Sequence, residues 1–319
     1  MHSSLFFKLF PPPKFMVMKH AGLDISDDAV HCLEYSCGRA PDLRITKHKT
    51  VEIPENLING GEIADDKAFS AILTKFDKEN DLTYVKVSVP EEKAYLFQTD
   101  VVGDNPRAIA QNIEFKLEEN VPLAVADAVF YFDILPMSVT GGVLRASVSV
   151  VPRVYVEKVI LLLRDSGISP MAFEVVPKAI ARAIIPANST NTILIIQVMN
   201  KKTGMYIVAG GVVCFTSTVA WGSRGEESGI SLLVKEIGRI YEYWASHGIA
   251  GSEIKQVIMV GRDAPKFLEK IKSTAAEVGL SVSLGNVWNN AFSIDKYIPS
   301  ISREDSLDYA VAAGLAMEL

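Results

Sequence analysis

The stretch Gly22-Leu23-Asp24-Ile25-Ser26-Asp27-Asp28-Ala29-Val30-His31 decides the fold of this protein. Apolar residues lead into a Ser-Asp-Asp turn and resume directly after it, which predicts a hairpin of strands over 21–25 and 29–35. The stretch Ile195-Ile196-Gln197-Val198-Met199-Asn200-Lys201-Lys202-Thr203-Gly204 repeats this strand–turn–strand pattern in the second half. We therefore expect two lobes of similar fold, duplicated in structure although not in sequence.

The hydrophobic pattern around each hairpin extends this prediction. The first half predicts a strand over 43–51, an amphipathic helix from Asp65 to Glu79 and a buried strand over 83–89. The second half predicts strands over 193–198, 205–209 and 212–219, a long helix that includes Ile230 and Trp244, a strand over 256–260, a helix over 264–278, a strand over 281–284 and a final helix over 305–318.

Residues 90–166 have an order of their own. A strand over 94–101 leads to a helix opened by Asp104-Asn105-Pro106, a cap followed by proline. Strands over 128–139 and 143–151 flank the hairpin signal Thr140-Gly141-Gly142, and a helix follows over 153–166. We expect a leader at 1–18, a first lobe at 19–89 and 167–190, an inserted α+β subdomain at 90–166 and a second lobe at 191–319.

Composition limits the class of function. The 319 residues carry a net charge of −6. The sequence therefore lacks the excess of positive charge that would favour nucleic acid as the main partner. Three cysteines, with no second pair to complete a zinc site, favour packing roles or reduced thiols. The apolar segment Leu5–Phe10 precedes three prolines and is open to two interpretations, a contact with a membrane or partner and a disordered leader.

Several short motifs, in this order, resemble the PilM family of type IV pilus assembly proteins, actin-like proteins close to the cell-division protein FtsA. The motifs are Gly22-Leu23-Asp24-Ile25 with Ala29-Val30-His31, Glu52-Ile53-Pro54, Gly61-Glu62-Ile63-Ala64-Asp65, Phe115-Lys116-Leu117-Glu118-Glu119-Asn120-Val121-Pro122-Leu123, Val260-Gly261-Arg262-Asp263-Ala264, Asn286-Val287-Trp288 and Ala310-Val311-Ala312-Ala313-Gly314-Leu315-Ala316. The resemblance extends from about Lys19 to Leu319. It implies an actin-like, ribonuclease H-like α/β fold of two lobes with a subdomain inserted in the first.

The resemblance also implies a nucleotide cleft, but one with altered residues. Its nucleotide-binding positions fall on Asp24, Ser26, Asp28, Thr203 and Gly261, and Asp24 is the position that would face Mg²⁺. Ser26 stands where the family has a glycine, while Gln197 replaces its aspartate and Met199 a second glycine. Asp27 and Asp28 would bring two carboxylates close to a bound triphosphate, and they would repel it by ~1 kcal/mol or more per close pair. We therefore expect no catalytic residue and no required cofactor, with ATP and Mg²⁺ as the ligands that this cleft would take.

The resemblance implies a non-catalytic cytosolic scaffold of a type IV pilus or a related secretion machine. Such a scaffold grips the N-terminal cytosolic peptide of a single-pass, PilN-like membrane protein and contacts the assembly motor. It would lie peripherally at the inner membrane through its partner, or through Leu5–Phe10. The alternative is an actin-like protein that still binds ATP and Mg²⁺ and switches conformation or hydrolyses ATP slowly. Scaffolds of the same fold, such as the cytoplasmic part of the secretion protein GspL, also remain open.

Overall fold

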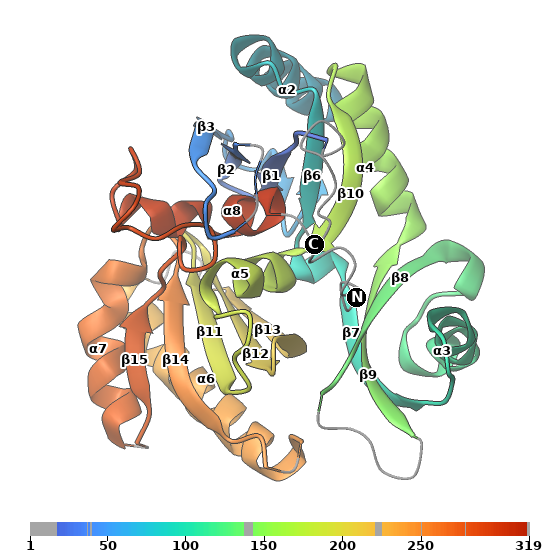
Figure 1. The fold of residues 1–319 in the computed structure, drawn as a ribbon, viewed down its shortest axis with the longest axis vertical. Coiled ribbons are helices and arrows are strands. Elements are labelled where there is room, and N and C mark those ends of the chain that lie inside the picture. Colours follow the sequence, from blue (N-terminus) through green and yellow to red (C-terminus); the bar gives the residue numbers. More distant parts are fainter. Residues whose placement is uncertain are drawn as a thin grey trace.

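Two five-stranded sheets with the same topology form the body of the protein (Figure 1). The computed structural model describes residues 18–36, 38, 40–136, 143–220, 225–249, 251–277 and 279–317. The first sheet has the order β10 (Ser169–Val175), β6 (Tyr84–Val89), β1 (Ala21–Ile25), β2 (Ala29–Tyr35) and β3 (Ile45–Glu52). The second has the order β13 (Val212–Ala220), β12 (Lys202–Ala209), β11 (Thr192–Val198), β14 (Ile254–Val260) and β15 (Ser281–Leu284).

Strand directions confirm the predicted duplication. In each lobe three consecutive strands form an antiparallel meander, β1–β2–β3 in one and β11–β12–β13 in the other. Two further parallel strands then extend each sheet: β6 pairs with β1 and β10 with β6 in one lobe, and β14 pairs with β11 and β15 with β14 in the other. Parallel neighbours require crossover connections, which the helices between them supply.

Helices cover the outer side of each sheet. On the first sheet, α2 (Asp66–Asn80) and α4 (Arg153–Asp165) contribute to a core with β1, β2 and β6. On the second, α6 (Gly225–His247) and α7 (Ala264–Glu277) pack in the same way. The Asp65 side chain caps α2 by accepting from Lys67 N and Ala68 N, as its position in the sequence predicts.

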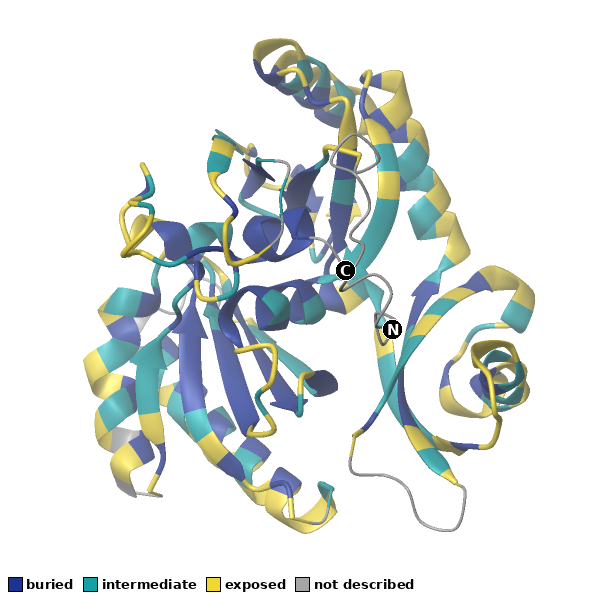
Figure 2. Ribbon diagram, viewed as in Figure 1, coloured by how far each residue is buried: buried dark blue, intermediate teal, exposed yellow. Residues whose placement is uncertain are grey.

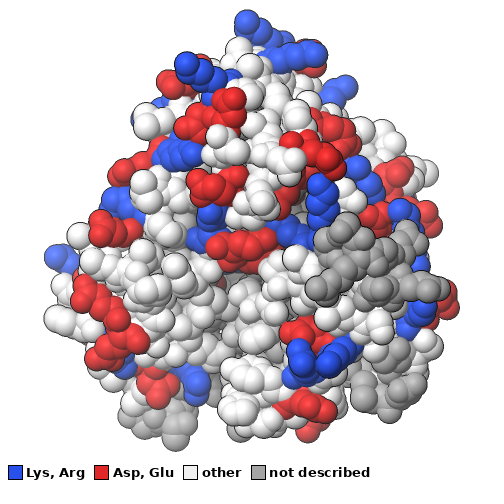
Figure 3. Space-filling model, turned by 180° about the vertical axis from the view of Figure 1, so that it is seen from behind, with Lys and Arg blue, Asp and Glu red and all other residues white. Residues whose placement is uncertain are grey.

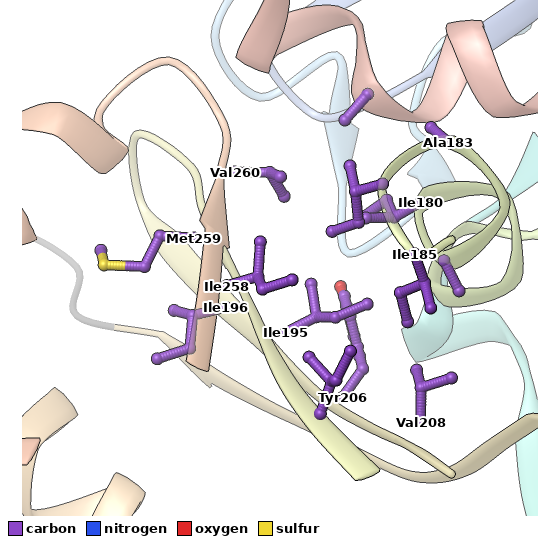
Figure 4. Close-up of a cluster of buried hydrophobic side chains, with 14 of the residues drawn as sticks. Ile180, Ala183, Ile185, Ile195, Ile196, Tyr206, Val208, Ile258, Met259 and Val260 are labelled. Atoms are coloured by element: carbon purple, nitrogen blue, oxygen red, sulfur yellow. The ribbon is translucent and has the colours of Figure 1, made fainter. Parts of the chain in front are cut away.

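Two short helices, α5 (Val176–Ile184) and α8 (Ala310–Ala316), lie between the sheets. Every residue of α8 is buried, and Figure 2 shows it dark blue along its length. Figure 4 shows Ile180 and Ile185, at α5, facing Ile195 and Tyr206 of the second sheet. A helix that is apolar on all sides, as α8 is, has to be enclosed, whereas α5 buries one face and carries Lys178 and Arg182 on the other.

Glycines allow the backbones at this crossing to approach closely. A Cβ atom at Gly22 of β1 would lie 2.0 Å from the carbonyl oxygen of Ala312 in α8. A Cβ atom at Gly314 of α8 would lie 1.8 Å from the carbonyl oxygen of Ala179 in α5. No side chain fits at either place, so the stack of β1, α8 and α5 depends on two glycines.

The inserted subdomain is a three-stranded antiparallel sheet that curves around one helix. Its order is β7 (Tyr95–Val101), β9 (Leu144–Pro152) and β8 (Ala128–Ile134), and α3 (Pro106–Asn120) packs on the sheet. As predicted, Asn105 caps α3 and Pro106 is its first residue. The hairpin turn at 140–142 lies outside the described residues. Short elements complete the fold: β4 (Ile58–Asn59), β5 (Glu62–Ile63), η2 (Glu91–Lys93), η3 (Val125–Asp127) and η4 (Asp305–Tyr309).

The structure differs from the sequence prediction in several places. Strand β10 and helix α5 were not predicted, and the final helix begins as the 3-10 turn η4 before α8. The packing also assigns two helices differently from the predicted boundaries. The side chains of α4, predicted within the inserted subdomain, join the core of the first sheet, and α8, predicted within the second lobe, packs on β1, β2 and β6. Both helices bury their apolar residues against the sheet that they reach, whatever their place along the chain.

Within the described part of the chain, no helix is both long and apolar enough to span a membrane. The leader segment Leu5–Phe10 lies outside the described residues. Cys32 and Cys214 are buried, and burial raises the pKa of each thiol to about 12, which fits the packing role predicted for cysteines.

The glycine crossing gives a stability prediction. Replacing Gly314 by Ala should lower the free energy of unfolding by about 3 kcal/mol, because the new methyl group has to displace backbone. Gly238, in the exposed interior of α6, is the matched control, since nothing lies within 4 Å of a Cβ atom there. Gly238→Ala should raise stability by up to ~1 kcal/mol. Urea unfolding of both variants tests this, and equal effects would contradict the proposed crossing.

Candidate functional site

A cleft of about 710 Å³ opens between the lobes, where the turns of the β1–β2 and β11–β12 hairpins face each other. Four of the five residues predicted for a nucleotide site line it, namely Asp24, Ser26, Asp28 and Gly261. The fifth, Thr203, is fully buried on β12. Side chains alternate between the faces of a strand, and Lys202 beside Thr203 takes the cleft side. The structure therefore brings together four of the five.

The first turn is held closed by its own polar groups. Ser26 Oγ donates to the carbonyl oxygen of Ala29 at 2.8 Å, and Ser26 N donates to the same oxygen at 3.0 Å. The Asp27 carboxylate accepts from the backbone N–H groups of Gly60 and Gly61, each at 3.0 Å. Burial would raise the pKa of Asp27, but the Lys202 charge and these two N–H groups outweigh it and hold the pKa below its usual value. Asp27 is thus engaged within the protein.

A chain of ionisable groups runs from the first sheet across the cleft. Asp24 Oδ2 lies 4.0 Å from His31 Nδ1, and His31 Nε2 lies 3.1 Å from Asp308 Oδ2. Arg262, which follows β14, reaches the same Asp308 oxygen at 2.8 Å and Glu52 Oε1 at 3.3 Å. Burial raises the pKa of Asp24, although the nearby His31 opposes that rise. Arg262 therefore ties the second lobe to carboxylates of η4 and β3.

The second turn carries Lys202 into the cleft. Its Nζ atom lies 3.1 Å from Asp27 Oδ2 and 2.5 Å from Glu92 Oε1. Burial would lower the pKa of Lys202, but Glu92 and Asp27 outweigh that effect and the pKa is raised. Beside it, Lys201 meets Glu55 at 3.2 Å on the surface. Gln197 and Met199 also line the cleft.

Close packing of the backbone is enough to explain why residue 261 is a glycine. Gly261 has a φ of +96°, and a Cβ atom there would lie 2.2 Å from the carbonyl oxygen of Val198. The end of β14 therefore approaches the end of β11 too closely for any side chain. This glycine, expected at the adenosine end of a nucleotide site, is required by the fold itself.

Each cationic side chain of the cleft contacts a carboxylate. Lys202 pairs with Asp27 and Glu92, and Arg262 pairs with Asp308 and Glu52. Lys201 and Lys266 pair with Glu55 and Asp263. Figure 3 shows the same intermixing of both charges across the back of the molecule. A polyphosphate entering the cleft would have to break these pairs before it could meet a cation.

The carboxylates of the cleft are not arranged to hold a Mg²⁺ ion either. Within the described ranges, no three His, Cys, Asp or Glu side chains are grouped to hold a metal ion. Asp27 points to its two glycine N–H groups and to Lys202, while Asp24 is buried beside Ser88 and His31. The residues present therefore do not fit an ATP–Mg²⁺ complex in this conformation. A role for Asp24 toward Mg²⁺ stays a prediction.

Sequence reasoning missed several residues that shape the cleft. Lys202, Glu91, Glu92 and Asp308 were not singled out, because their partners are remote along the chain. One signal was available: Lys202, Gly204 and Tyr206 alternate along a strand, which places a cation, a gap and a hydroxyl on one face.

Comparison with known proteins identifies relatives of this fold. The sequence matches no known protein family and no curated protein. Among solved structures, the PilM–PilN type IV pilus biogenesis complex matches with a TM-score of 0.77 and 16% identity, over 94% of this chain and 98% of that chain. This chain has the fold found in the PilM–PilN complex. EutJ, an ethanolamine utilization protein from Carboxydothermus hydrogenoformans, matches with a TM-score of 0.51 and 10% identity, over 96% of this chain and 90% of that chain.

These likenesses confirm the predicted two-lobed, actin-like fold and the structural resemblance to PilM. At such low identities the likeness concerns the fold. The function of the cleft and of the inserted subdomain has to be argued from this chain's own residues.

The buried histidine gives a pH prediction. Burial would lower the pKa of His31, but the hydrogen bond and charge of Asp308, with Asp24, outweigh burial and raise it above 6.5. The stabilisation of the fold by protonated His31 is therefore fully present below pH 6.5 and is lost as the pH rises through the folded-state pKa of His31. The advantage of wild type over His31→Gln in urea unfolding should shrink between pH 5.5 and 8.5.

His48 supplies a control of opposite sign. Burial, together with the Lys49 charge, lowers the pKa of His48. The contribution of neutral His48 to stability is therefore fully present above pH 6.5 and is lost as the pH falls through the folded-state pKa. The advantage of wild type over His48→Gln should therefore grow with pH. The same trend for both variants would refute the assigned environment of His31.

Proposed function

We propose that this protein is a non-catalytic cytosolic scaffold in the inner-membrane assembly complex of a type IV pilus or a related secretion machine. The likeness to the PilM–PilN complex is the observation that carries this proposal, because it extends over 94% of the chain and thus includes both lobes and the inserted subdomain. On this proposal the ligand is the N-terminal cytosolic peptide of a PilN-like membrane protein, which also brings the scaffold to the membrane and toward the assembly motor.

The state of the cleft supports a non-catalytic role. Hydrolysis needs a group that orients or deprotonates the attacking water. Gln197 provides an amide at the position where the family resemblance implies an aspartate. The Lys202 ammonium contacts Asp27 and Glu92 in the space between the turns. A cleft already neutralised by its own side chains has little to offer a triphosphate.

The first lobe and the inserted subdomain offer apolar surface for a peptide. Val129 and Tyr131 on β8 are exposed, and so is Met171 on β10. The Lys178 ammonium of α5 lies 3.5 Å from the centroid of the Tyr131 ring, which fixes the ring over the junction of the two parts. An aromatic ring, exposed but positioned in this way, suits recognition of a peptide.

Titration with a peptide tests the scaffold role. The N-terminal cytosolic peptide of the PilN-like protein from the same organism should bind with a micromolar Kd, about −8 kcal/mol, in calorimetry. Tyr131→Ala should weaken binding at least tenfold, since it removes the positioned ring. Phe115→Ala is the matched control, because Phe115 is 85% exposed on the outer helix α3. A larger loss from Phe115→Ala would instead place the peptide along 111–121, and no binding by wild type would refute the scaffold proposal.

The alternative function, an ATP-switched actin-like protein, is tested separately. Titration of ATP with Mg²⁺ should give no binding heat up to millimolar concentration, because the cations of the cleft are already paired. Micromolar binding that is lost in Asp24→Ala would establish a working nucleotide site and favour the alternative. Binding unaffected by Asp24→Ala would instead locate the nucleotide elsewhere.

A further inference from the structure

The short turn η2 contacts the second sheet through two successive residues, Glu91 and Glu92. Glu91 Oε1 lies 2.8 Å from the Tyr206 hydroxyl and accepts from Thr218 Oγ1 at 3.0 Å. The next residue, Glu92, accepts from Lys202 Nζ at 2.5 Å. Glu91 is buried, whereas Glu92 lies at the surface with 23% of its side chain exposed. The two glutamates of this turn, which lies between β6 of the first lobe and β7 of the inserted subdomain, therefore contact the second lobe, while Lys93 pairs with Glu62 of the first lobe.

The receiving face of the second sheet is shaped for these carboxylates. Lys202, Gly204 and Tyr206 alternate on β12 and so share one face. Gly204 pairs with Gln197 on β11 and with Thr218 on β13, which places all three in one row on that face. A Cβ atom at Gly204 would lie 1.9 Å from the Tyr206 hydroxyl and 2.9 Å from Glu91 Oε1. The missing side chain leaves a gap in the row, and Glu91 with the Tyr206 hydroxyl fills it.

Further polar contacts join the second lobe to the first lobe and to the inserted subdomain. Lys202 bonds to Asp27 in the β1–β2 turn, and Asp27 in turn accepts from the N–H groups of Gly60 and Gly61. In the inserted subdomain, Gln98 Nε2 donates to the carbonyl oxygen of Cys214, and Ser147 Oγ donates to that of Val213. One edge of the second sheet thus holds both other parts of the molecule.

We propose that Glu91, Glu92 and Lys202 form a latch that closes the lobes without any ligand and holds the inserted subdomain in place against the second lobe. The Lys202 ammonium supplies, from within the chain, the charge that joins the two sides of the cleft. Closure is then a permanent property of the protein, and the position of the inserted subdomain depends on it. The latch acts whatever partner the inserted subdomain binds.

A distance measurement between the lobes tests the latch. Spin labels at Lys75→Cys on α2 and Glu269→Cys on α7, both on exposed helix surface, report the separation of the lobes, with Cys37 replaced by Ser. The unliganded protein should give one narrow distance distribution. Lys202→Met, which keeps the length of the side chain and removes its charge, should broaden the distribution and shift it to longer distances.

Lys201→Met is the matched control, because Lys201 is the adjacent lysine and pairs with Glu55, whose side chain is 80% exposed. It should leave the distribution unchanged. Glu92→Gln removes the same ion pair from the other lobe and should reproduce the effect of Lys202→Met, so a folding defect of one variant does not decide the result. If both variants match Lys201→Met, the latch is refuted. The measurement needs no peptide, and its outcome is independent of the scaffold proposal.

Discussion

The close stacking of α8 between β1 and α5 is the constraint on which the rest of the structure depends. At Gly22 and Gly314 backbone meets backbone, so the spacing of β1, α8 and α5 is set without side chains that could adapt. Because η4 and α8 come from the end of the chain, this stacking also carries Asp308 to His31 and to Arg262. The geometry of the cleft therefore follows from how tightly a short, fully buried helix fits between two lobes.

Charge balance shapes the cleft between the lobes. Buried carboxylates are costly unless cations or N–H groups meet them. Asp27 is met by two glycine N–H groups and by Lys202, and Asp308 is met by His31 and Arg262. The protein thus provides internally the positive charge that these acidic residues require.

The sequence predicted features that depend on local chemistry. The two hairpins and the cap of α3 follow from residues next to each other, and the structure has them in place. Strand β10 was missed because Pro170, near its start, conceals it, and α5 because it is short and has a proline as its second residue. Of the site, the sequence located the turns but not their partners. His31 and Asp308 are 277 positions apart, and no spacing rule connects them.

A rigid, closed body suits a scaffold better than a switch. A nucleotide-driven switch needs two states within a few kcal/mol of each other, so that a ligand can shift their populations. Hydrogen bonds that involve charged groups contribute about 1.5–3 kcal/mol each, and Lys202 makes two of them across the cleft, to Asp27 and to Glu92. Both favour the closed state. On the proposed scaffold role, the benefit would fall on the inserted subdomain, because a binding surface that is already held in place loses less entropy when a peptide docks.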